Sequence, residues 1–584
     1  MAFLIGPLYS ISARRSRRYL AVLSWLLCHL GARAAKFGDL GASLLQVKAD
    51  PHDTLSLIPQ PKTVRDPLSE QRQGHVTLNK ACDPPPGPRN QRTTNRRTGR
   101  LELHELRYDA PSAPPALRAA LGDVLGATPG ASGAAAGLRL MLQEEAEDFH
   151  PEGYRLNVSE EGIALEASTE HGLFNGLMTL RQLMVHRADS EGGGWSLQKV
   201  EIEDAPEFAW RGLMLDVSRH FFSPTAVKHL LKTMALFKMN HFHWHLTDDQ
   251  GWRFPVAKYP NLIRLGAHRR ATQQGHSSAT DGRPYNHSYT EEEIHEVLSL
   301  AESLYIEVVP EFDIPGHSQA LIASYPEMGN ADSAARWSPE VATHFGALQY
   351  TLSPSERSVN FTKDVLSEMA QLFQASPYVH IGGDEVPTAQ WEHSPSAMAV
   401  ARKEHVSLKR LEGMMLGKAA EHLHGLGRKA VVWDDAMESG GHLPDDAVVM
   451  IWRSWEGLEK LGNRAFAQGH SVVLAPQAYT YLDQWQDRTH SHFDAIGGFL
   501  PLSTVYASPT HAGRAHVLGI QGQLWSEYIR EGSRNLDYMA WPRGCALAEV
   551  GWSGEGRGRF RDFRQRLAKR LEDFKLYDIN LGEM

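Results

Sequence analysis

The sequence predicts an α/β protein in which a small α/β domain, residues 35–205, precedes a (β/α)8 TIM barrel, residues 206–584. Three observations support this prediction: the pattern changes near Ala205, eight apolar runs follow with helix-length segments between them, and polar and aromatic residues gather where these runs end. Parallel strands that are buried on both faces read as such runs. Eight strand-and-helix units fit a closed barrel with insertions better than an open sheet.

The composition is typical of a folded, soluble protein of more than one domain. Hydrophobic residues make up 42% of the 584 residues and charged residues 22%, which argues against disordered, collagen-like or polytopic membrane chains. With 60 Lys and Arg against 69 Asp and Glu, the formal net charge is −9. The bulk charge therefore gives no support to nucleic-acid binding.

Residues 1–34 are typical of a signal peptide. Four arginines between residues 14 and 18 precede the apolar run YLAVLSWLLCHL, and Ala32-Arg33-Ala34 gives an A-x-A cleavage pattern. The alternatives are a membrane anchor or a first core helix, but the run is short of the roughly 20 residues that span a bilayer. We expect an exported protein, periplasmic or secreted, with no membrane span after signal removal. Removal of the signal peptide takes away five arginines and no acidic residue, so the remaining chain has a formal net charge of −14.

The three cysteines, Cys28, Cys82 and Cys545, are too few for a disulfide scaffold and lack the close spacing of a zinc or redox site. Cys82 and Cys545 are far apart in the sequence, so we expect two free thiols rather than a bridge.

Residues 35–205 alternate between short β-like runs and helical stretches. YRLNVSEEGIALEAS predicts two strands around Glu161-Gly162, and HGLFNGLMTLRQLM carries apolar residues at helical spacing. The loop DPPPGPRNQRTTNRRTGR fits an exposed connection better than an anion site. No pattern in this domain points to chemistry.

The eight predicted strands of the barrel are, in chain order, RGLMLDVSRHF, NHFHWHLTDD, IEVVPEFDIPGH, YVHIGGDEV, KAVVWDDA, VVMIWR, SVVLAPQAYTYLD and VLGIQGQLWSE. In such a barrel the carboxyl ends of the strands surround the active site, so the residues at these ends are the candidates for function.

The fourth run ends in the most informative pattern. HIGGDEV, residues 380–386, places the adjacent carboxylates Asp384 and Glu385 after two glycines. A helix N-cap followed by an acid in the first turn would also account for the pair. The functional interpretation is a general acid beside an assisting carboxylate. Adjacent residues could hardly flank a scissile glycosidic bond from opposite sides, so one of the two must have another role.

The chain resembles glycoside hydrolase family 20, the β-N-acetylhexosaminidases, over nearly its whole length after the signal. The blocks LIPQPKTV, HFHWHLTDDQGWR, PEFDIPGH, HIGGDEV, YTYLDQWQ, LWSE and ALAEVGWS follow in the order of that family. The resemblance implies a non-catalytic N-terminal domain, a catalytic barrel and no cofactor. It also implies substrate-assisted catalysis, in which the 2-acetamido oxygen of the sugar attacks the anomeric carbon and forms an oxazolinium ion.

The resemblance further implies roles for single residues. Glu385 would protonate the glycosidic oxygen and later deprotonate water, while Asp384 would hold the acetamide N–H and stabilise the charge that develops there. Tyr481 would hydrogen-bond the acetamide oxygen, although outside YTYLD it would be interpreted as a core tyrosine. Asp483 would bind a sugar hydroxyl, and it shares a strand face with Tyr481 if the strand continues.

A second group of ionisable residues follows the second and third runs. Each alone is more often structural, but the resemblance suggests that His317 hydrogen-bonds Glu385 and is oriented by Asp248, a relay that adjusts the pKa of the acid between its two roles. Asp313 is expected in the same network, among the substrate-binding residues, without a defined role.

His241, His243 and His245 alternate, so on a strand all three could point to one face, as zinc ligands would. No further ligand pattern follows, and the family uses no metal for catalysis. We therefore expect packing and hydrogen-bonding roles and no metal site.

Trp433, Trp452 and Trp525 end the fifth, sixth and eighth runs, where flat apolar faces could line a pocket around a pyranose ring and its acetamide methyl group. A single tryptophan would more often belong to the core. Arg219 in DVSRHF and Glu527 in LWSE are expected to bind hydroxyls of the terminal sugar, although either could be an ordinary ion-pair partner.

We therefore expect an exo-acting β-N-acetylhexosaminidase that removes terminal N-acetylglucosamine or N-acetylgalactosamine from oligosaccharides or glycoconjugates, such as chitin fragments, with net retention. One alternative keeps the fold and releases a terminal disaccharide or a modified hexosamine. Another is a glycan-binding protein without turnover, against which the joint presence of Asp384, Glu385 and Tyr481 argues.

Overall fold

The computed structural model places residues 56–584 in one compact unit. It describes residues 55–65, 100–103, 107–109, 117–118, 121–122, 125, 128–130, 137–143, 149–186, 195–333, 337, 339–488, 495–530, 533–570, 574 and 579–581. The predicted signal peptide, residues 1–34, and Cys82 lie outside these ranges, so those predictions stay predictions. Cys545 is a buried free thiol. Within the described ranges no helix is long and apolar enough to cross a membrane.

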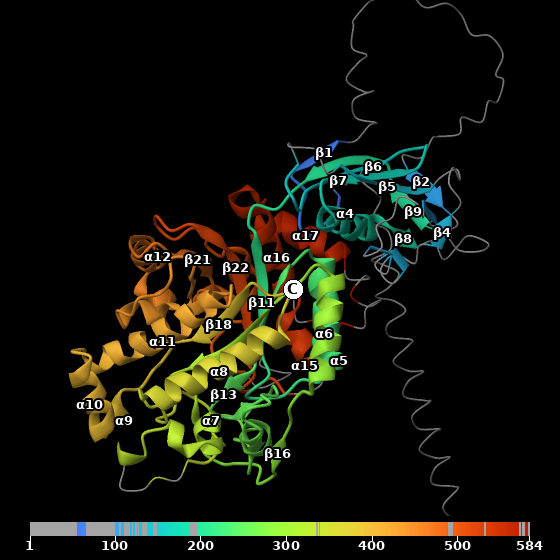
Figure 1. Ribbon diagram of the computed structural model, residues 1–584. Coiled ribbons are helices and arrows are strands. Elements are labelled where there is room, and N and C mark those ends of the chain that lie inside the picture. Colours follow the sequence, from blue (N-terminus) through green and yellow to red (C-terminus); the bar gives the residue numbers. More distant parts are fainter. Residues whose placement is uncertain are drawn as a thin grey trace, which may run out of the picture. The chain divides into compact units, whose positions relative to one another are not determined.

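Among the described residues before the barrel are two sheets and the helix α4 (Glu170–Leu183) (Figure 1). The seven-stranded sheet has the order β1 (Thr63–Arg65), β10 (Val200–Asp204), β6 (Tyr154–Val158), β7 (Ile163–Ala167), β5 (Leu138–Leu142), β3 (Arg107–Asp109) and β4 (Thr128–Gly130). The smaller sheet has the order β2 (Arg100–Leu103), β9 (Trp195–Gln198) and β8 (Val185–His186). The predicted antiparallel pair around Glu161-Gly162 is confirmed as β6 and β7, and the predicted helix as α4 (Glu170–Leu183).

Eight parallel strands close into a barrel, which confirms the predicted fold class. In order around the barrel they are β11 (Trp210–Asp216), β12 (His241–His245), β17 (Glu307–Ile314), β18 (Tyr378–Gly382), β19 (Lys429–Trp433), β20 (Val448–Ile451), β21 (Ser471–Leu474) and β22 (Val517–Leu524). Seven lie within their predicted segments, and β11 begins one residue before its segment, at Trp210. Both faces of these strands are buried, which is why their sequences read as apolar runs.

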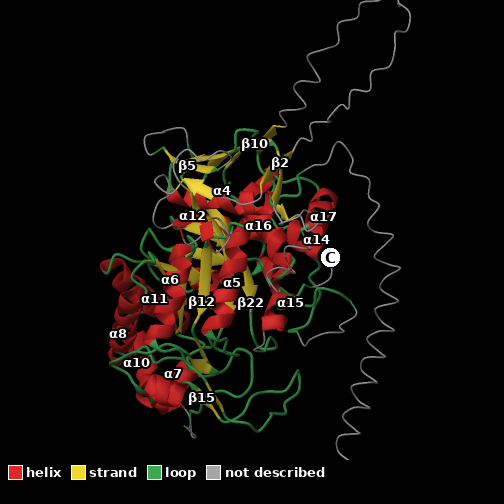
Figure 2. Ribbon diagram, turned by 90° about the vertical axis from the view of Figure 1, so that its right-hand side faces the viewer, coloured by secondary structure: helices red, strands yellow, loops and turns green. Residues whose placement is uncertain are grey.

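Helices surround the strands (Figure 2). They are α5 (Pro224–Leu236), α6 (Glu291–Ser303), α7 (Gln319–Ser324), α8 (Glu356–Leu372), α9 (Ala389–His393), α10 (Pro395–Lys403), α11 (Leu408–Gly425), α12 (Leu458–Ala467), α13 (Gln477–Thr480), α14 (Leu502–Tyr506), α15 (Ser533–Ala540), α16 (Arg543–Ser553) and α17 (Phe560–Lys569). Short turns of helix lie at Leu262–Gly266, Pro326–Met328, Ala331–Ser333, Asp434–Glu438, Ser454–Glu456 and Gly554–Gly556. Two small hairpins pair β13 (Thr247–Asp248) with β14 (Gly251–Trp252) and β15 (His268–Arg269) with β16 (Tyr285–Asn286).

Local sequence explains where these helices begin. Helix α6 starts with a capping box, in which the Thr290 side chain accepts from the Glu293 N–H and the Glu293 side chain accepts from the Thr290 N–H. Its buried residues Ile294, Val297 and Ala301 recur at helical spacing and face the barrel. The helix therefore begins and faces inward as its sequence dictates.

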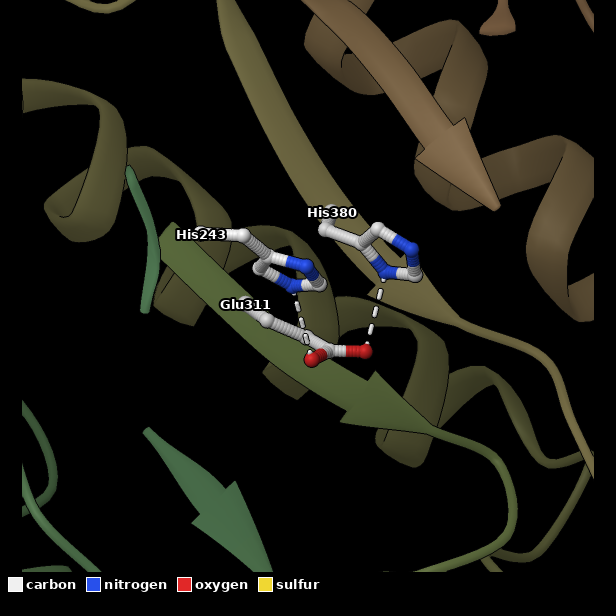
Figure 3. Close-up of side chains that lie close together, drawn as sticks. All are labelled: His243, Glu311 and His380. Atoms are coloured by element: carbon white, nitrogen blue, oxygen red, sulfur yellow. Dashed lines mark hydrogen bonds and ion pairs between the residues drawn. The ribbon is translucent and has the colours of Figure 1, made fainter. Parts of the chain in front are cut away.

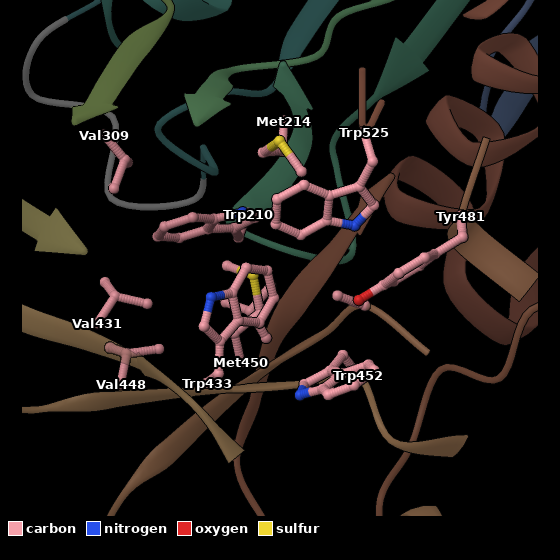
Figure 4. Close-up of a cluster of buried hydrophobic side chains, with 12 residues drawn as sticks. Trp210, Met214, Val309, Val431, Trp433, Val448, Met450, Trp452, Tyr481 and Trp525 are labelled. Carbon is pink, nitrogen blue, oxygen red and sulfur yellow. The ribbon is translucent and has the colours of Figure 1, made fainter. Parts of the chain in front are cut away.

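The interior of the barrel is both aromatic and polar. A buried cluster joins Trp210, Met214, Val309, Val431, Trp433, Val448, Met450, Trp452, Val473, Ala475, Tyr481 and Trp525 (Figure 4). Ionisable and amide side chains share this interior with no exposure at all: His243, Glu311, His380 and Gln521. Burying such groups is costly unless they are hydrogen-bonded, so their partners matter for the site above them.

Candidate active site

A cavity of about 440 Å³ lies at the carboxyl ends of the barrel strands. Nine of the twelve predicted site residues line it: Arg219, His317, Asp384, Glu385, Trp452, Tyr481, Asp483, Trp525 and Glu527. The other three, Asp248, Asp313 and Trp433, are buried behind this lining. The strand ends thus bring together residues that are more than 300 positions apart in the sequence.

The turn after β18 presents the two adjacent carboxylates differently. Gly382 and Gly383 have φ values of 68° and 94°, and Glu385 itself has a φ of 47°. The Asp384 side chain is 13% exposed, whereas that of Glu385 is 43% exposed. The more exposed carboxyl can reach a leaving group at the mouth of the cavity, and the buried one can act only on a group held inside it.

His317 lies between the two carboxylates and Asp248. Its Nδ1 is 3.3 Å from Asp248 Oδ1, which confirms the predicted contact. Its Nε2 is 3.7 Å from both Asp384 Oδ2 and Glu385 Oε2. At these distances the predicted hydrogen bond from His317 to Glu385 is instead an ion-pair contact, which Nε2 shares equally between the two acids.

These contacts separate the pKa values of the acids. Burial would lower the pKa of His317, but the Asp248 carboxylate and the nearby acids raise it well above 6.5. The nearby His317 ring lowers the pKa of Glu385, against the effect of burial. Burial raises the pKa of Asp384 to about 7, and the Glu385 charge adds to this effect. Two carboxyl groups whose pKa values are shifted in opposite directions are suited to two different roles.

Tyr481 and Asp483 line the cavity, but not as the continuation of a strand. Strand β21 ends at Leu474, and the four-residue helix α13 intervenes before Tyr481, which then forms a single bridge with Gln523 on β22. We expected Tyr481 and Asp483 to share a strand face if the strand continued. The strand does not continue, so this arrangement is not formed. Pro476 at the start of α13 accounts for the break, since proline favours a helix start over a central strand.

Aromatic rings form one wall of the cavity. The Trp452 ring stacks near that of Tyr481 with centroids 6.2 Å apart, and the Trp525 ring lies 6.3 Å from Tyr481 (Figure 4). Trp433 does not line the cavity, contrary to our expectation. It is 1% exposed, and its indole N–H donates to Glu311 Oε1 at 3.0 Å. It supports Trp525 from beneath, with ring centroids 6.0 Å apart.

Arg219 is fixed before any ligand arrives. Its Nη2 lies 2.7 Å from Asp248 Oδ2, its Nη1 3.3 Å from Asp216 Oδ2, and its Nε donates to Gln250 at 3.1 Å. The guanidinium group also lies 5.0 Å from the Trp525 ring centroid. A buried arginine held on several sides can present its remaining N–H groups to a ligand without ordering a flexible side chain.

Three carboxylates of the lining carry a buried oxygen that has no hydrogen-bond partner among the described residues: Asp384 Oδ1, Asp483 Oδ1 and Glu527 Oε2. Burial raises the pKa of each of these groups. A buried hydrogen-bond acceptor without a partner raises the free energy of the folded protein. The cavity is therefore suited to a ligand that brings several hydrogen-bond donors. Asp313 Oδ1 is also unpartnered, but Asp313 sits behind Asp384 rather than in the lining, which corrects its expected contact with substrate.

The alternating histidines of β12 occupy successive levels of the barrel. His241 Nδ1 lies 2.7 Å from Asn240 Oδ1, His243 Nε2 lies 2.9 Å from Glu311, and His245 contacts both Glu311 and Asp248. Several groups of His, Asp and Glu here have side-chain atoms within 4.8 Å of one another, as metal ligands would. Their direct hydrogen bonds account for the histidines of β12, and the expected absence of a metal stays a prediction.

Sequence reasoning missed part of the lining. Gln477, Ala478, Gln484, Ile496, Gly497 and Gly498 complete the cavity. The position of Gln484 next to Asp483 was an available signal, and the Gly-Gly pair indicated a turn. Nothing in the local pattern of Gln477 or Ile496 indicated a cavity.

Comparison with known proteins places the chain in a family. The model of the glycosyl hydrolase family 20 catalytic domain matches residues 208–555, and that of family 20 domain 2 matches residues 54–205. The chain is 35% identical over 444 residues to a beta-hexosaminidase of Porphyromonas gingivalis, covering 74% of this chain and 54% of that protein. It is 37% identical over 415 residues to a beta-hexosaminidase of Vibrio furnissii, covering 68% and 65%. The matched part thus spans about half to two thirds of the length of these two relatives.

Solved structures agree. The exo beta-N-acetylglucosaminidase of Vibrio harveyi, in complex with N-acetylglucosamine, has a TM-score of 0.73 and 29% identity, covering 92% of this chain and 80% of that chain. A mutant beta-hexosaminidase of Streptomyces plicatus in complex with its product has a TM-score of 0.73 and 27% identity, covering 92% and 98%. The family models, the closed barrel and the resemblance of the sequence blocks agree, and the chain belongs to glycosyl hydrolase family 20.

Proposed function

We propose that this protein is a β-N-acetylhexosaminidase that removes a terminal, non-reducing N-acetylglucosamine or N-acetylgalactosamine from oligosaccharides or glycoconjugates by substrate-assisted, retaining hydrolysis. Two relatives named above are called beta-hexosaminidases and a third is called an exo beta-N-acetylglucosaminidase, and the cavity of this chain supports the proposal.

One observation carries the proposal. The unpartnered oxygens of Asp384, Asp483 and Glu527 belong to a cavity that Trp452, Tyr481 and Trp525 wall on one side. A pyranose ring with an acetamide group offers both an apolar face for the aromatic rings and several donors, the hydroxyls and one N–H, for the carboxylates. A purely apolar ligand would leave the three oxygens unsatisfied.

In the first step of the proposed reaction, Glu385 gives its proton to the glycosidic oxygen as the bond to the anomeric carbon breaks. The acetamide carbonyl oxygen of the same sugar forms the new bond to that carbon and yields an oxazolinium ion. Asp384 accepts the acetamide N–H and offsets the positive charge that develops on the ring. The Tyr481 hydroxyl donates to the acetamide oxygen and positions it for attack.

In the second step, water attacks the anomeric carbon and Glu385 takes its proton, so the acid is restored and the oxazolinium ring opens to the acetamide. Two inversions at one carbon give net retention. The Glu385 side chain is 43% exposed, and an aglycone above it would exclude water and raise the pKa of its carboxyl, which favours the protonated form needed for the first step.

The proposal is tested with 4-nitrophenyl β-N-acetylglucosaminide, the matching galactosaminide and, as a control, 4-nitrophenyl β-glucoside. The glucoside has the same leaving group but no acetamide, so it should not be hydrolysed. NMR of the first-formed sugar should show the β anomer. Turnover of the glucoside at a similar rate would instead point to a nucleophile on the enzyme, and absence of all turnover would favour the glycan-binding alternative.

A further inference from the structure

Glu311 occupies the centre of the barrel beneath the cavity and is fully buried. The strand register places it beside His245 on β12 and His380 on β18. Its Oε1 lies 2.9 Å from His380 Nδ1, and its Oε2 lies 2.9 Å from His243 Nε2 (Figure 3). Oε1 also accepts from the Trp433 N–H at 3.0 Å, and Oε2 also contacts His245 Nδ1. His380 Nδ1 accepts from the Gly382 N–H at 3.1 Å, so the donors to Glu311 are the rings of Trp433, His243 and His245. Burial opposes the charge of Glu311, but the surrounding histidines hold the pKa of its carboxyl well below 4.5, so the carboxylate is ionised.

The other contacts of these rings show how their protons are placed. The Gln521 amide nitrogen lies 3.0 Å from His243 Nδ1, so that nitrogen accepts and His243 is a neutral ring that donates through Nε2. Burial lowers the pKa of His243 to about 4, in agreement with a neutral ring. His243 therefore satisfies Glu311 without adding charge.

His245 differs, because each of its ring nitrogens faces a carboxylate. Its Nδ1 contacts Glu311 Oε2, and its Nε2 lies 3.0 Å from Asp248 Oδ2. A neutral imidazole has one N–H and would leave its bare nitrogen against an anion, so this geometry requires an imidazolium ion. Burial opposes the charge, but Glu311 and Asp248 hold the pKa of His245 well above 6.5.

The ionisable groups that face His245 come from four strands. They are Asp216 on β11, His243 on β12 itself, Asp248 on β13, and Glu311 and Asp313 on β17. Burial and the neighbouring Asp384 raise the pKa of Asp313 well above 3.8, which weakens the contribution of this carboxyl to the charge around His245. The remaining acids are more than enough to keep His245 charged.

Asp248 connects this buried cation to two parts of the site. Its Oδ2 is shared by His245 Nε2 and Arg219 Nη2 at 2.7 Å, and its Oδ1 faces His317 Nδ1 at 3.3 Å. One carboxylate thus fixes both the arginine of the sugar site and the histidine beside Glu385. The position of Asp248 in turn depends on the cation beneath it.

We propose that Glu311 and His245 are positioning residues, which hold Asp248 ionised and in place from below so that Arg219 and His317 are set at the correct distance from the substrate. The inference rests on the proposed function for its link to catalysis, whereas the charged state of His245 is independent of it. It assigns a task to two buried residues that touch no substrate.

The sequence offers a matched control. His243 and His245 lie on the same strand, are both fully buried and contact the same Glu311 oxygen, but only His245 reaches Asp248. We compare His245→Gln and Glu311→Gln with His243→Gln. Melting temperatures of all three report the cost of altering the barrel interior.

We expect His245→Gln and Glu311→Gln to lower kcat/KM by roughly a hundredfold, since small displacements of catalytic groups have effects of this size. KM should rise, because a displaced Arg219 would bind the sugar less tightly. The kcat value should fall most for chitobiose, whose poor leaving group needs a proton from Glu385 and therefore the neighbouring His317. His243→Gln, which can still donate to Glu311, should lose less than tenfold. A merely damaged fold would lower kcat equally for every substrate and leave KM unchanged. Equal losses in His243→Gln and His245→Gln would overturn the proposal.

A second measurement does not depend on activity. In protein labelled with 15N-histidine, the ring nitrogens of His245, assigned by their loss in His245→Gln, should both carry protons at pH 8, where an ordinary histidine is neutral. Glu311→Gln should convert His245 to a neutral ring, and His243→Gln should not. A neutral His245 ring in the wild-type protein would refute the charged anchor. If the wild-type protein failed to hydrolyse any N-acetylhexosaminide, the proposed function would fall while this measurement still decided the state of His245.

Discussion

The backbone at Gly382 passes so close to Asp313 that a Cβ atom there would lie 1.6 Å from Asp313 Oδ1. With a φ of 68°, the position also has a left-handed conformation that side chains disfavour. Two requirements, space and backbone angle, therefore select glycine at the end of β18. The result is a turn that carries Asp384 directly over Asp313 and brings Glu385 to the mouth of the cavity.

Gly382→Ala should destabilise the protein by roughly 2 to 4 kcal/mol, because the clash cannot be relieved without moving Asp313 or the turn. It should also lower kcat/KM at least tenfold, since Asp384 and Glu385 follow within three residues. Gly425→Ala, at the end of α11, is the control, because a Cβ there meets nothing within 4 Å. Denaturant unfolding of both variants measures the difference. If Gly382→Ala unfolded at the same denaturant concentration as the wild-type protein, the turn would have adapted to the methyl group and the prediction would be wrong.

Replacing the two adjacent carboxylates should have different consequences. Glu385→Gln should lower kcat by a factor of about 100 to 10,000 for chitobiose, but much less for 2,4-dinitrophenyl N-acetylglucosaminide, whose leaving group needs no proton. Asp384→Asn should slow both substrates to a similar degree, since stabilisation of the oxazolinium ion does not depend on the leaving group. Steady-state kinetics on the two substrates test this. Small and equal losses in both variants would refute the two roles.

The pH dependence of kcat/KM should be bell-shaped, with limbs that belong to the Asp384 and Glu385 pair. The productive pair holds one proton, on Glu385, with Asp384 ionised. Activity should fall as pH rises through about 7, where the pair loses that proton, and again in acid, where it gains a second.

In Asp384→Asn the neighbouring negative charge is gone, so the Glu385 pKa drops and the basic limb should move to lower pH. Initial rates at substrate concentrations far below KM, over the range of about pH 4 to 9, give both profiles. A basic limb that stays at the same pH in this variant would mean that another group controls it.

Cleavage should start at the non-reducing end, because Arg219 and Glu527 are expected to hold free hydroxyls of the terminal sugar. An internal sugar would leave buried charged groups unpaired, at a cost of about 1 to 3 kcal/mol each. A chitin pentamer labelled at its reducing end should give labelled tetramer first and then trimer, with free monosaccharide at each step. Early labelled trimer without tetramer would favour release of a disaccharide.

The same digestion can be repeated with Glu527→Gln, which keeps the shape of the side chain but loses its charge. We expect a raised KM and the same order of products, since the substitution leaves the rest of the cavity lining unchanged. A switch to internal cleavage in this variant would show that charge rather than shape decides where the chain enters.

The sequence by itself determined the barrel and most of the residues that line its cavity. Strand identity is local information, because a strand that is buried on both faces needs a run of apolar residues wherever it lies in the fold. The carboxyl ends of parallel strands meet at one face, so polar residues that follow these runs, such as Arg219, Glu385 and Glu527, were predictable as neighbours without knowing any distance.

The tertiary structure alone decided how deep each side chain lies and which proton it carries. Trp433 and Trp452 end neighbouring strands in similar sequence patterns, but the first is covered by Trp525 and bonded to Glu311 while the second lines the cavity. His243 and His245 are two residues apart, but the amide of Gln521 makes one neutral and the carboxylate of Asp248 makes the other a cation. Depth and charge depend on partners from other strands, and the stagger that brings those partners together arises only when the barrel closes.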